Sequence, residues 1–291
     1  MHARRSGGRM RERFLETNGI NLHVVEDGPE DGPLVVLLHG FPEFSYGWRK
    51  QIGPLAEAGF RVIAPDQRGY SLSDKPKGAA AYNLDVLADD LIGLIDVMGR
   101  RTARVVGHDW GAGVTWWAAN KFPERLEKIA VLNVPHHRVF MRALRENRRQ
   151  RLRSWYMYYF QMPGIPELTL RAGRFAAMRG SLRRTSRPGT FTDEDLDRYV
   201  GAWSQPGALT AMLNWYRASF RHPPQKLSAY RITVPTLMIW GARDQMLGPE
   251  LAAPSIELCD HGKLVMIDQA THWVQHEDAE CVNALLIEHL R

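Results

Sequence analysis

The 291-residue sequence has little cysteine and no long hydrophobic run. Its two cysteines, Cys259 and Cys281, lack the spacing of metal ligands, and so few thiols exclude a disulfide framework and favour a reducing compartment. No uninterrupted apolar stretch approaches the roughly 18–20 residues that a membrane-spanning helix requires. Repeats and low-complexity segments are also missing. These absences predict a cytoplasmic protein with no membrane span.

What the sequence does contain is enough apolar material for a large buried core. Hydrophobic residues make up 44% of the chain, which suits one α/β domain or one core domain that carries an insertion. The first residues do not form an export signal. Arg4-Arg5 is followed by Gly7-Gly8-Arg9, where such a signal would need an apolar stretch. We interpret residues 1–11 as a disordered basic tail.

Positive charge is concentrated in one part of the sequence. The net charge is +6, yet the segment from Arg138 to Arg187 contains 13 Arg, two Glu and neither Lys nor Asp, a local balance of +11. Aromatic residues typical of a core or pocket lie between these arginines. We interpret the segment as a solvated basic helical face, with an acidic membrane surface or nucleic acid as the alternative partner. No nucleic-acid-binding motif accompanies the charge, so we expect no nucleic-acid partner.

Hydrophobic periodicity predicts an α/β fold that is interrupted by a helical insertion. Apolar runs typical of strands alternate with segments that have helical spacing. The strand-like runs are at 20–26, 33–40, 60–66, 103–107, 128–133, 233–241 and 262–268. From about residue 138 to 221 this alternation stops, and the segment is helix-like with prolines as breaks. We therefore expect a core domain of residues 12–137 and 222–291, with a helical cap at 138–221 inserted after the strand-like run at 128–133.

One strand runs into a turn with the glycine spacing of a nucleophile elbow. The residues Gly107-His108-Asp109-Trp110-Gly111 match G-x-S-x-G, except that aspartate stands where serine is usual. Flanking glycines let the strand and the helix approach, so the central side chain projects above the sheet. Aspartate is also a preferred helix N-cap, and this motif alone leaves nucleophile and cap equally open.

Two later loops carry the partners that a nucleophile would need. Asp244 follows the strand-like run at 233–241, and His272 follows the run at 262–268, which gives the chain order nucleophile, acid, histidine. Functional side chains collect at such carboxyl ends of parallel strands. His272 and His276 are spaced like a metal pair, but no glutamate of H-E-x-x-H lies between them and no third ligand is evident. We therefore predict a catalytic base at His272 and no metal.

The segment HGFPEFSYGWR, residues 39–49, directly follows a buried strand. This is the position of the loop that donates one oxyanion-hole amide in hydrolases with a nucleophile elbow. We expect the backbone N–H groups of Phe41 and of Trp110, the residue after the nucleophile, to form the hole. Losing one such donor typically costs about 10²–10³ in rate.

Taken together, the motifs HGFPEFSYGWR, DQRGYSLSDKP, GHDWGAGVTW and THWVQHE resemble those of soluble, bacterial-like epoxide hydrolases of the α/β-hydrolase fold. The resemblance extends from about Phe14 to the C-terminus. It implies an α/β-hydrolase fold with an eight-stranded, mostly parallel sheet, flanking helices and an inserted helical cap. It also implies two cap tyrosines that bind the epoxide oxygen: Tyr156 in YMYYFQMPG and Tyr216 in LNWYR. Tyr158 and Tyr159 are close enough to Tyr156 for a different register.

The implied reaction explains why a carboxylate stands at the elbow. Attack by Asp109 on an epoxide carbon gives an ester, whose carbonyl can then be attacked by water that His272, oriented by Asp244, activates. A serine would give an ether, which offers no carbonyl. We expect a small apolar epoxide and water as substrates, no cofactor, and a monomer or homodimer. The predicted pocket residues are Phe41, Trp110, Met157, Met212 and Trp273.

Two other functions compete with this interpretation. Haloalkane and haloacetate dehalogenases use the same aspartate nucleophile, but a departing halide needs N–H donors whereas an epoxide oxygen needs an acid. The two cap tyrosines therefore favour the epoxide. A non-catalytic ligand-binding protein on the same scaffold is a weaker alternative, because such a protein could lose a triad residue and this sequence has all three.

Overall fold

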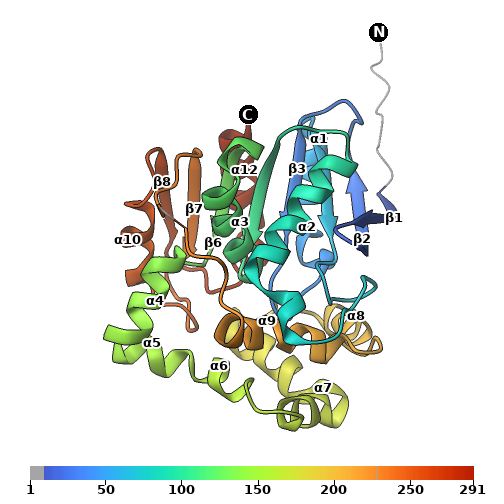
Figure 1. Cartoon of the computed structure of the whole chain (residues 1–291), viewed down its shortest axis with the longest axis vertical. Helices are drawn as coiled ribbons and strands as arrows, with labels where there is room; N and C mark the ends of the chain where they lie inside the picture. Colours follow the sequence, from blue (N-terminus) through green and yellow to red (C-terminus); the bar gives the residue numbers. More distant parts are fainter. Residues whose placement is uncertain (1–9, 228) are drawn as a thin grey trace.

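The computed structural model describes residues 10–227 and 229–291, and its centre is an eight-stranded sheet (Figure 1). The strands are β1 (Arg11–Thr17), β2 (Ile20–Asp27), β3 (Leu34–Leu38), β4 (Arg61–Pro65), β5 (Ala103–His108), β6 (Leu126–Leu132), β7 (Thr236–Gly241) and β8 (Gly262–Ile267). Their order is β1-β2-β4-β3-β5-β6-β7-β8. Strands β3 to β8 are parallel, whereas β2 is antiparallel to β1 and β4. The predicted α/β fold with a mostly parallel sheet is confirmed.

The central strands are buried on both faces because helices cover both sides. The helices are α1 (Ile52–Glu57), α2 (Leu84–Val97), α3 (Trp110–Lys121), α4 (His137–Glu146), α5 (Arg148–Arg153), α6 (Trp155–Tyr159), α7 (Ile165–Thr185), α8 (Asp193–Trp203), α9 (Ala208–Arg221), α10 (Ala252–Ile256), α11 (Val274–Glu277) and α12 (Ala279–Leu290). Side chains of α1 and α12 share one apolar cluster with alternate residues of β3, and α2 and α3 share the other. This arrangement explains why β3 is apolar throughout.

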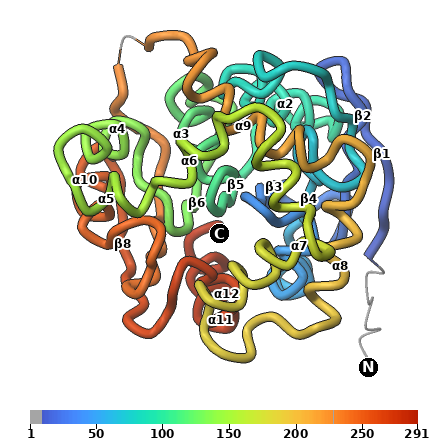
Figure 2. Tube along the Cα trace, turned by 90° about the horizontal axis from the view of Figure 1, so that it is seen from below, coloured from blue at the N-terminus to red at the C-terminus, as the bar shows by residue number. Residues whose placement is uncertain are grey.

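Helices α4 to α9, which we call the cap, lie together at one end of the sheet (Figures 1 and 2). The carboxyl ends of β5, β7 and β8 point toward this end. Helix α7 is interrupted at residues 172–175, where Gly173, Arg174 and Phe175 have positive φ. Two aromatic anchors fasten the cap to the core: the Trp203 Nε1 donates to the Pro42 carbonyl, and the Trp215 Nε1 donates to the Arg68 carbonyl at 3.0 Å.

The strand β1 was not predicted from the sequence. Its segment RERFLET is mostly charged, and only Leu15 and Thr17 are buried, as befits an edge strand with one neighbour. The disordered tail predicted for residues 1–11 lies outside the described residues except at its end. There Arg11 pairs with Glu26 as the first residue of β1, so the prediction was wrong for Arg11. Among the described residues, no helix is long and apolar enough to cross a bilayer.

Candidate active site

Asp109 sits in a sharp turn between β5 and α3, in a backbone conformation that aspartate rarely adopts. Its φ is 49° and its ψ is −124°. A Cβ on Gly111 would lie 2.0 Å from the Leu38 carbonyl oxygen, and one on Gly40 would lie 2.2 Å from the Asp109 Cβ. Both glycines are therefore required for the close approach of the turn to β3 and its following loop. The local packing holds a strained residue with its side chain above the sheet.

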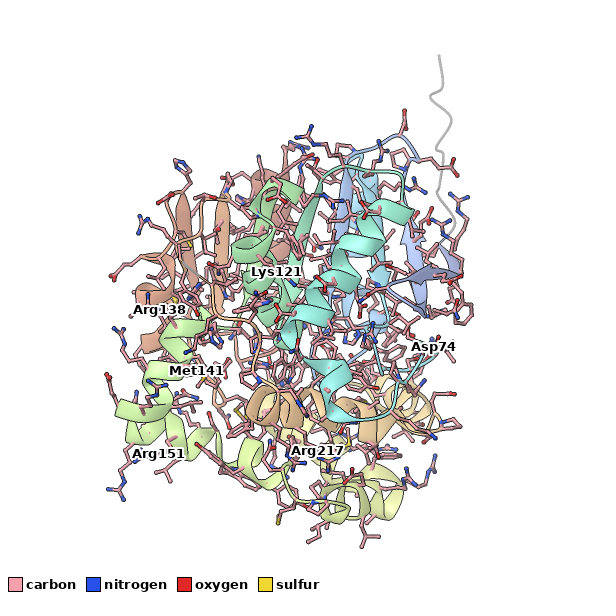
Figure 3. The ribbon with its side chains drawn as sticks, in the orientation of Figure 1. Asp74, Lys121, Arg138, Met141, Arg151 and Arg217 are labelled. Atoms are coloured by element: carbon pink, nitrogen blue, oxygen red, sulfur yellow. The ribbon has the colours of Figure 1, made fainter. Side chains whose placement is uncertain are left out.

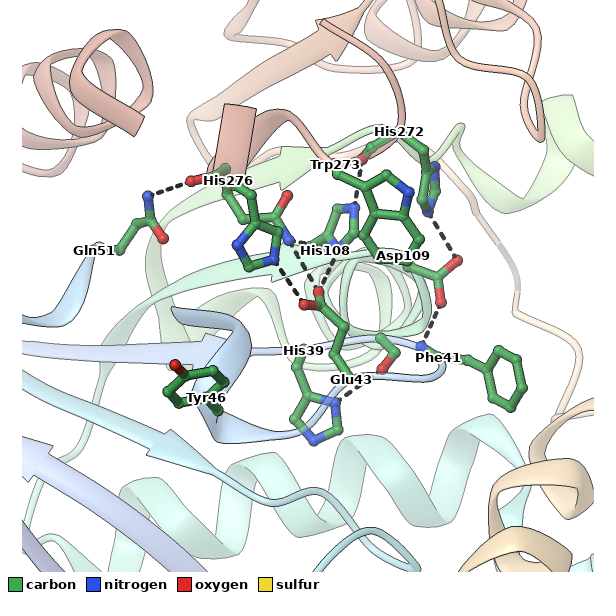
Figure 4. Close-up of polar contacts among 12 residues, drawn as sticks. His39, Phe41, Glu43, Tyr46, Gln51, His108, Asp109, His272, Trp273 and His276 are labelled. Carbon is green, nitrogen blue, oxygen red and sulfur yellow. Dashed lines mark hydrogen bonds and ion pairs between the residues drawn. The ribbon is translucent and has the colours of Figure 1, made fainter. Parts of the chain in front are cut away.

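The two carboxylate oxygens of Asp109 have different neighbours (Figure 4). Oδ1 accepts a hydrogen bond of 2.7 Å from the Phe41 backbone N–H, whereas Oδ2 lies 3.5 Å from the His272 Nε2. Within the described chain, no hydrogen bond joins the Trp110 N–H to the carboxylate. Burial disfavours the charge of Asp109, but His272 and the Phe41 N–H together hold its pKa below the ordinary value. Asp109 is thus an anion with one anchored oxygen and one exposed to the histidine.

His272 is held between two carboxylates. Its Nδ1 lies 2.8 Å from Asp244 Oδ2, and Asp244 Oδ1 accepts the backbone N–H groups of Met246 and Leu247 at 2.7 and 2.9 Å. Burial disfavours the imidazolium, but Asp244 and Asp109 outweigh this effect and raise the pKa of His272 to about 10. The resting site is therefore an ion-paired triad of Asp109, His272 and Asp244.

The structure adds Asn133, which the sequence analysis did not select. Its Nδ2 donates to Asp244 Oδ2 at 2.8 Å, and its Oδ1 accepts the Gly241 N–H at 3.1 Å. Asn133 directly follows β6 and has a φ of 55°, a conformation that asparagine tolerates better than most residues. The rule that pointed to the carboxyl ends of strands would have found it, had it been applied to polar neutral residues.

A cavity of about 290 Å³ opens above Asp109, between the core and the cap. Both predicted cap tyrosines line it, and the ring centroids of Tyr156 and Tyr216 are 5.9 Å apart. Neither phenol donates its proton to another described residue. Burial and the charge of Asp109 raise the pKa of both phenols above the ordinary value of 10, so both remain protonated donors. The Tyr159 hydroxyl, by contrast, is bonded to Thr169.

The structure brings only some of the predicted pocket residues to the cavity wall. Trp110 and Met157 line it. Phe41 packs beside it, with its ring centroid 5.4 Å from that of Tyr216. Met212 does not line the cavity, and its side chain is buried in the hydrophobic core. Trp273 also turns away, since its Nε1 donates to the Thr185 hydroxyl at 2.9 Å.

A buried polar cluster lies beside Asp109 and His272 (Figure 4). Glu43, two residues after the Phe41 amide, accepts hydrogen bonds from His276 Nε2 at 2.7 Å, the Tyr199 hydroxyl at 2.6 Å and Gln275 Nε2 at 3.0 Å. The burial of Glu43 disfavours its charge, but the two nearby histidines hold its pKa well below the ordinary value. Glu43 therefore joins the loop after β3 to helix α11 and to the cap helix α8.

His108, the residue before Asp109, takes part in the same cluster. His108 lies 3.4 Å from Glu43 through Nδ1, and its Nε2 donates to the His272 carbonyl at 2.8 Å. The backbone on both sides of the Asp109–His272 pair is thus fixed by one network. The sequence analysis gave His108 no role beyond its place in the elbow motif.

Comparisons with known proteins identify the family of this chain. Residues 33–279 match the family model described as alpha/beta hydrolase fold. An AB hydrolase superfamily protein of Bacillus subtilis is 50% identical over 96% of this chain and 97% of its own length. Epoxide hydrolase A of Mycobacterium tuberculosis is 37% identical over 96% of this chain and 97% of its own.

Solved structures of epoxide hydrolases are also similar to this chain over nearly its whole length. A Bacillus megaterium epoxide hydrolase in complex with an inhibitor superposes with a TM-score of 0.87, at 32% identity over 96% of this chain and 99% of that one. Epoxide hydrolase A of Mycobacterium thermoresistibile gives a TM-score of 0.85, at 35% identity over 97% of this chain and 98% of that one. The chain belongs to the α/β-hydrolase fold family. Within that family it is similar, over nearly its whole length, to proteins that are named epoxide hydrolases.

Proposed function

We propose that this protein is an epoxide hydrolase that converts an apolar epoxide and water to a vicinal diol through an ester on Asp109. The observation that carries the proposal is the shared cavity, in which the Asp109 carboxylate and the phenols of Tyr156 and Tyr216 line one apolar space. The nucleophile attacks carbon while the phenols bind the ring oxygen. The proton-donating phenols favour an epoxide over a haloalkane.

In the first step, Asp109 Oδ2 forms a bond to one epoxide carbon, and the bond between that carbon and the ring oxygen breaks. Oδ1 stays on the Phe41 N–H. The departing oxygen becomes an alkoxide, which is more basic than a phenolate, so it takes a proton from Tyr156 or Tyr216. The product of this step is a hydroxyalkyl ester of Asp109.

In the second step, His272 takes a proton from water, and the resulting hydroxide attacks the Asp109 Cγ. Ester formation has removed the charge of Asp109, which is one of the causes of the raised pKa of His272. The imidazolium therefore loses its proton more readily, through solvent to the tyrosinate that the first step leaves, and can then act as a base. The oxyanion forms at Oδ1, against the Phe41 N–H, with the Trp110 N–H as the second predicted donor. Its collapse breaks the bond to Oδ2, and the departing oxygen takes the proton from the His272 imidazolium, which releases the diol.

A His272→Gln variant tests the mechanism, because it blocks only the second step. Incubation with styrene oxide is expected to leave a stable adduct on the Asp109 peptide, detected by mass spectrometry. The exposed His261→Gln substitution serves as the control and should turn over without adduct. Absence of any adduct, together with halide release from haloalkanes by the wild type, would point to a dehalogenase instead.

Tyrosine variants test the two phenols and the register of the first one. Tyr156→Phe and Tyr216→Phe are each expected to lower kcat/KM by about a hundredfold, within the usual range for acid catalysis. Tyr158→Phe is the matched control, because Tyr158 lines the cavity but is 47% exposed and packs on Phe220. A larger loss at Tyr158 than at Tyr156 would reverse their assignment.

The cytoplasmic location and the choice between monomer and homodimer stay predictions.

A further inference from the structure

The Arg-rich segment of the cap, residues 138–187, supplies Tyr156 to the proposed reaction, but its arginines have no part in that reaction. Its arginines are accompanied by exposed apolar side chains: eight of the 13 large hydrophobic residues that are exposed in the described chain lie on the cap. Six of them follow one another along α5, α6 and the start of α7. These six, which we call the cap patch, are Leu152, Trp155, Tyr158, Met162, Ile165 and Leu168.

The cap patch faces away from the sheet. Helices α5, α6 and α7 form the outer side of the cap in both views (Figures 1 and 2). Trp155 is 63% exposed and Leu168 is 75% exposed, values at which these side chains gain little from the fold itself. Monomeric proteins rarely expose a continuous group of large apolar side chains without a partner.

Unpaired positive charge borders the cap patch. Arg142, Arg148 and Arg151 are exposed, and none of them forms an ion pair with a described residue. Arg151 lies at the outer edge of the cap (Figure 3). Arginine beside tryptophan and aliphatic residues is the composition of a surface that rests in the headgroup region of an anionic bilayer.

Two other partners fit these observations less well. A second copy of the chain would place the same unpaired arginines against each other, with few acidic groups in the segment to neutralise them. Nucleic acid would pair with the arginines and stack on Trp155, but it offers nothing to Leu152, Ile165 or Leu168.

The cap patch also adjoins the opening of the catalytic cavity. Tyr158 belongs to the patch and lines the cavity, and the exposed Met141 and Phe220 line the same opening. We propose that the cap patch and its arginines dock this protein onto anionic lipid surfaces. If the proposed function holds, docking would place the cavity opening beside a phase in which apolar epoxides concentrate.

Vesicle flotation tests the docking directly. The full chain is expected to float with vesicles of phosphatidylglycerol, not with vesicles of phosphatidylcholine, and to be released as salt rises. The variant R148E/R151E should weaken binding by about tenfold or more, since each basic residue near an anionic surface contributes measurably. R101E/R291E is its matched control, because these exposed arginines lie at the opposite end of the sheet and should leave binding unchanged.

The apolar contribution needs a second pair of variants. W155A/L168A should also weaken binding by about tenfold, whereas F14A/V97A, which removes similarly exposed residues far from the cap, should not. Hydrolysis of a water-soluble epoxide is measured on every variant, and it should stay unchanged, which separates this proposal from the proposed function. Equal binding to both lipids, binding to single-stranded DNA alone, or a dimer that only the cap variants dissociate would overturn the proposal.

Discussion

At the scale of single residues, the surroundings of His272 connect the resting site to its chemistry. Two carboxylates raise its pKa, and one of them is the nucleophile that the proposed reaction esterifies. The same residue is therefore an imidazolium while Asp109 is free and a base once Asp109 has reacted. The switch needs no movement, because it follows from the loss of one charge.

This account predicts the effect of removing that charge permanently. In Asp109→Asn, the pKa of His272 should fall from about 10, as measured by NMR titration of the ring proton. The pKa of His272 in the folded protein exceeds the ordinary 6.5, so the ion pairing of His272 stabilises the fold. This contribution is fully present below about pH 6.5 and is lost as the pH rises through about 10. An unchanged pKa in Asp109→Asn, with Asp85→Asn as the control, would contradict the account.

Asn133 offers a second test at this scale, as a positioning residue for Asp244. Asn133→Gly removes the side chain but tolerates the positive φ, so it isolates the hydrogen bond from backbone strain. Misplacement of the acid should lower kcat by about tenfold to a hundredfold with little change in KM. The ester on Asp109 should accumulate in this variant during turnover, which a purely structural defect would not cause.

At the scale of elements, the elbow depends on how closely α3 approaches β3. Gly111 and Gly113 lie in the same helix, yet they differ sharply in their surroundings. A Cβ at Gly111 would collide with backbone, while one at Gly113 would meet only the Trp110 ring at 3.8 Å. The two positions therefore form a matched pair.

Alanine at each position is expected to act in opposite directions. Gly111→Ala should lower the free energy of unfolding by about 3 kcal/mol or more, because backbone has to move. Gly113→Ala should raise it by up to about 1 kcal/mol, because alanine favours the helix. Urea denaturation measures both, and equal effects would show that the turn is less tightly packed than the distances imply.

The elements also show what the sequence can predict. The elbow, the acid and the histidine were predictable because glycine spacing and strand ends are local signals. Which residues of a cap helix reach the cavity is not a local property: Met212 and Tyr216 are four residues apart and share a face of α9, but only Tyr216 lines the cavity, so packing and not helical spacing decides. Likewise β1 lacks an apolar pattern, because its pairing with β2 and not its own burial makes it a strand.

At the scale of the whole molecule, Glu43 joins parts that are far apart in the sequence. Through Tyr199 it reaches the cap, and through Gln275 and His276 it reaches helix α11, which follows His272. The single buried carboxylate of Glu43 thus links the cap, the loop after β3 and helix α11. Buried charges of this kind are costly to leave without partners.

Replacement of Glu43 should therefore affect stability more than most single changes. Glu43→Gln is expected to lower the free energy of unfolding at pH 7 by about 3 kcal/mol, whereas the exposed Glu57→Gln should change it little. Because the pKa of Glu43 is depressed in the fold, its contribution is present above about pH 4.5 and is lost on further acidification. The difference in the free energy of unfolding between the wild type and Glu43→Gln should therefore become smaller when urea titrations are repeated at lower pH.

The unequal oxygens of Asp109 have one more consequence, which concerns the origin of the product's atoms. If Oδ2 attacks while Oδ1 stays on the Phe41 amide, the first diol carries an oxygen of the protein, and water replaces that oxygen. The replacement arrives on the same side, so the next diol carries it away in turn. After many turnovers in water labelled with oxygen-18, the Asp109 peptide should therefore hold one heavy oxygen and not two. The amide-bound oxygen would remain from synthesis of the chain, while its neighbour is renewed in every cycle.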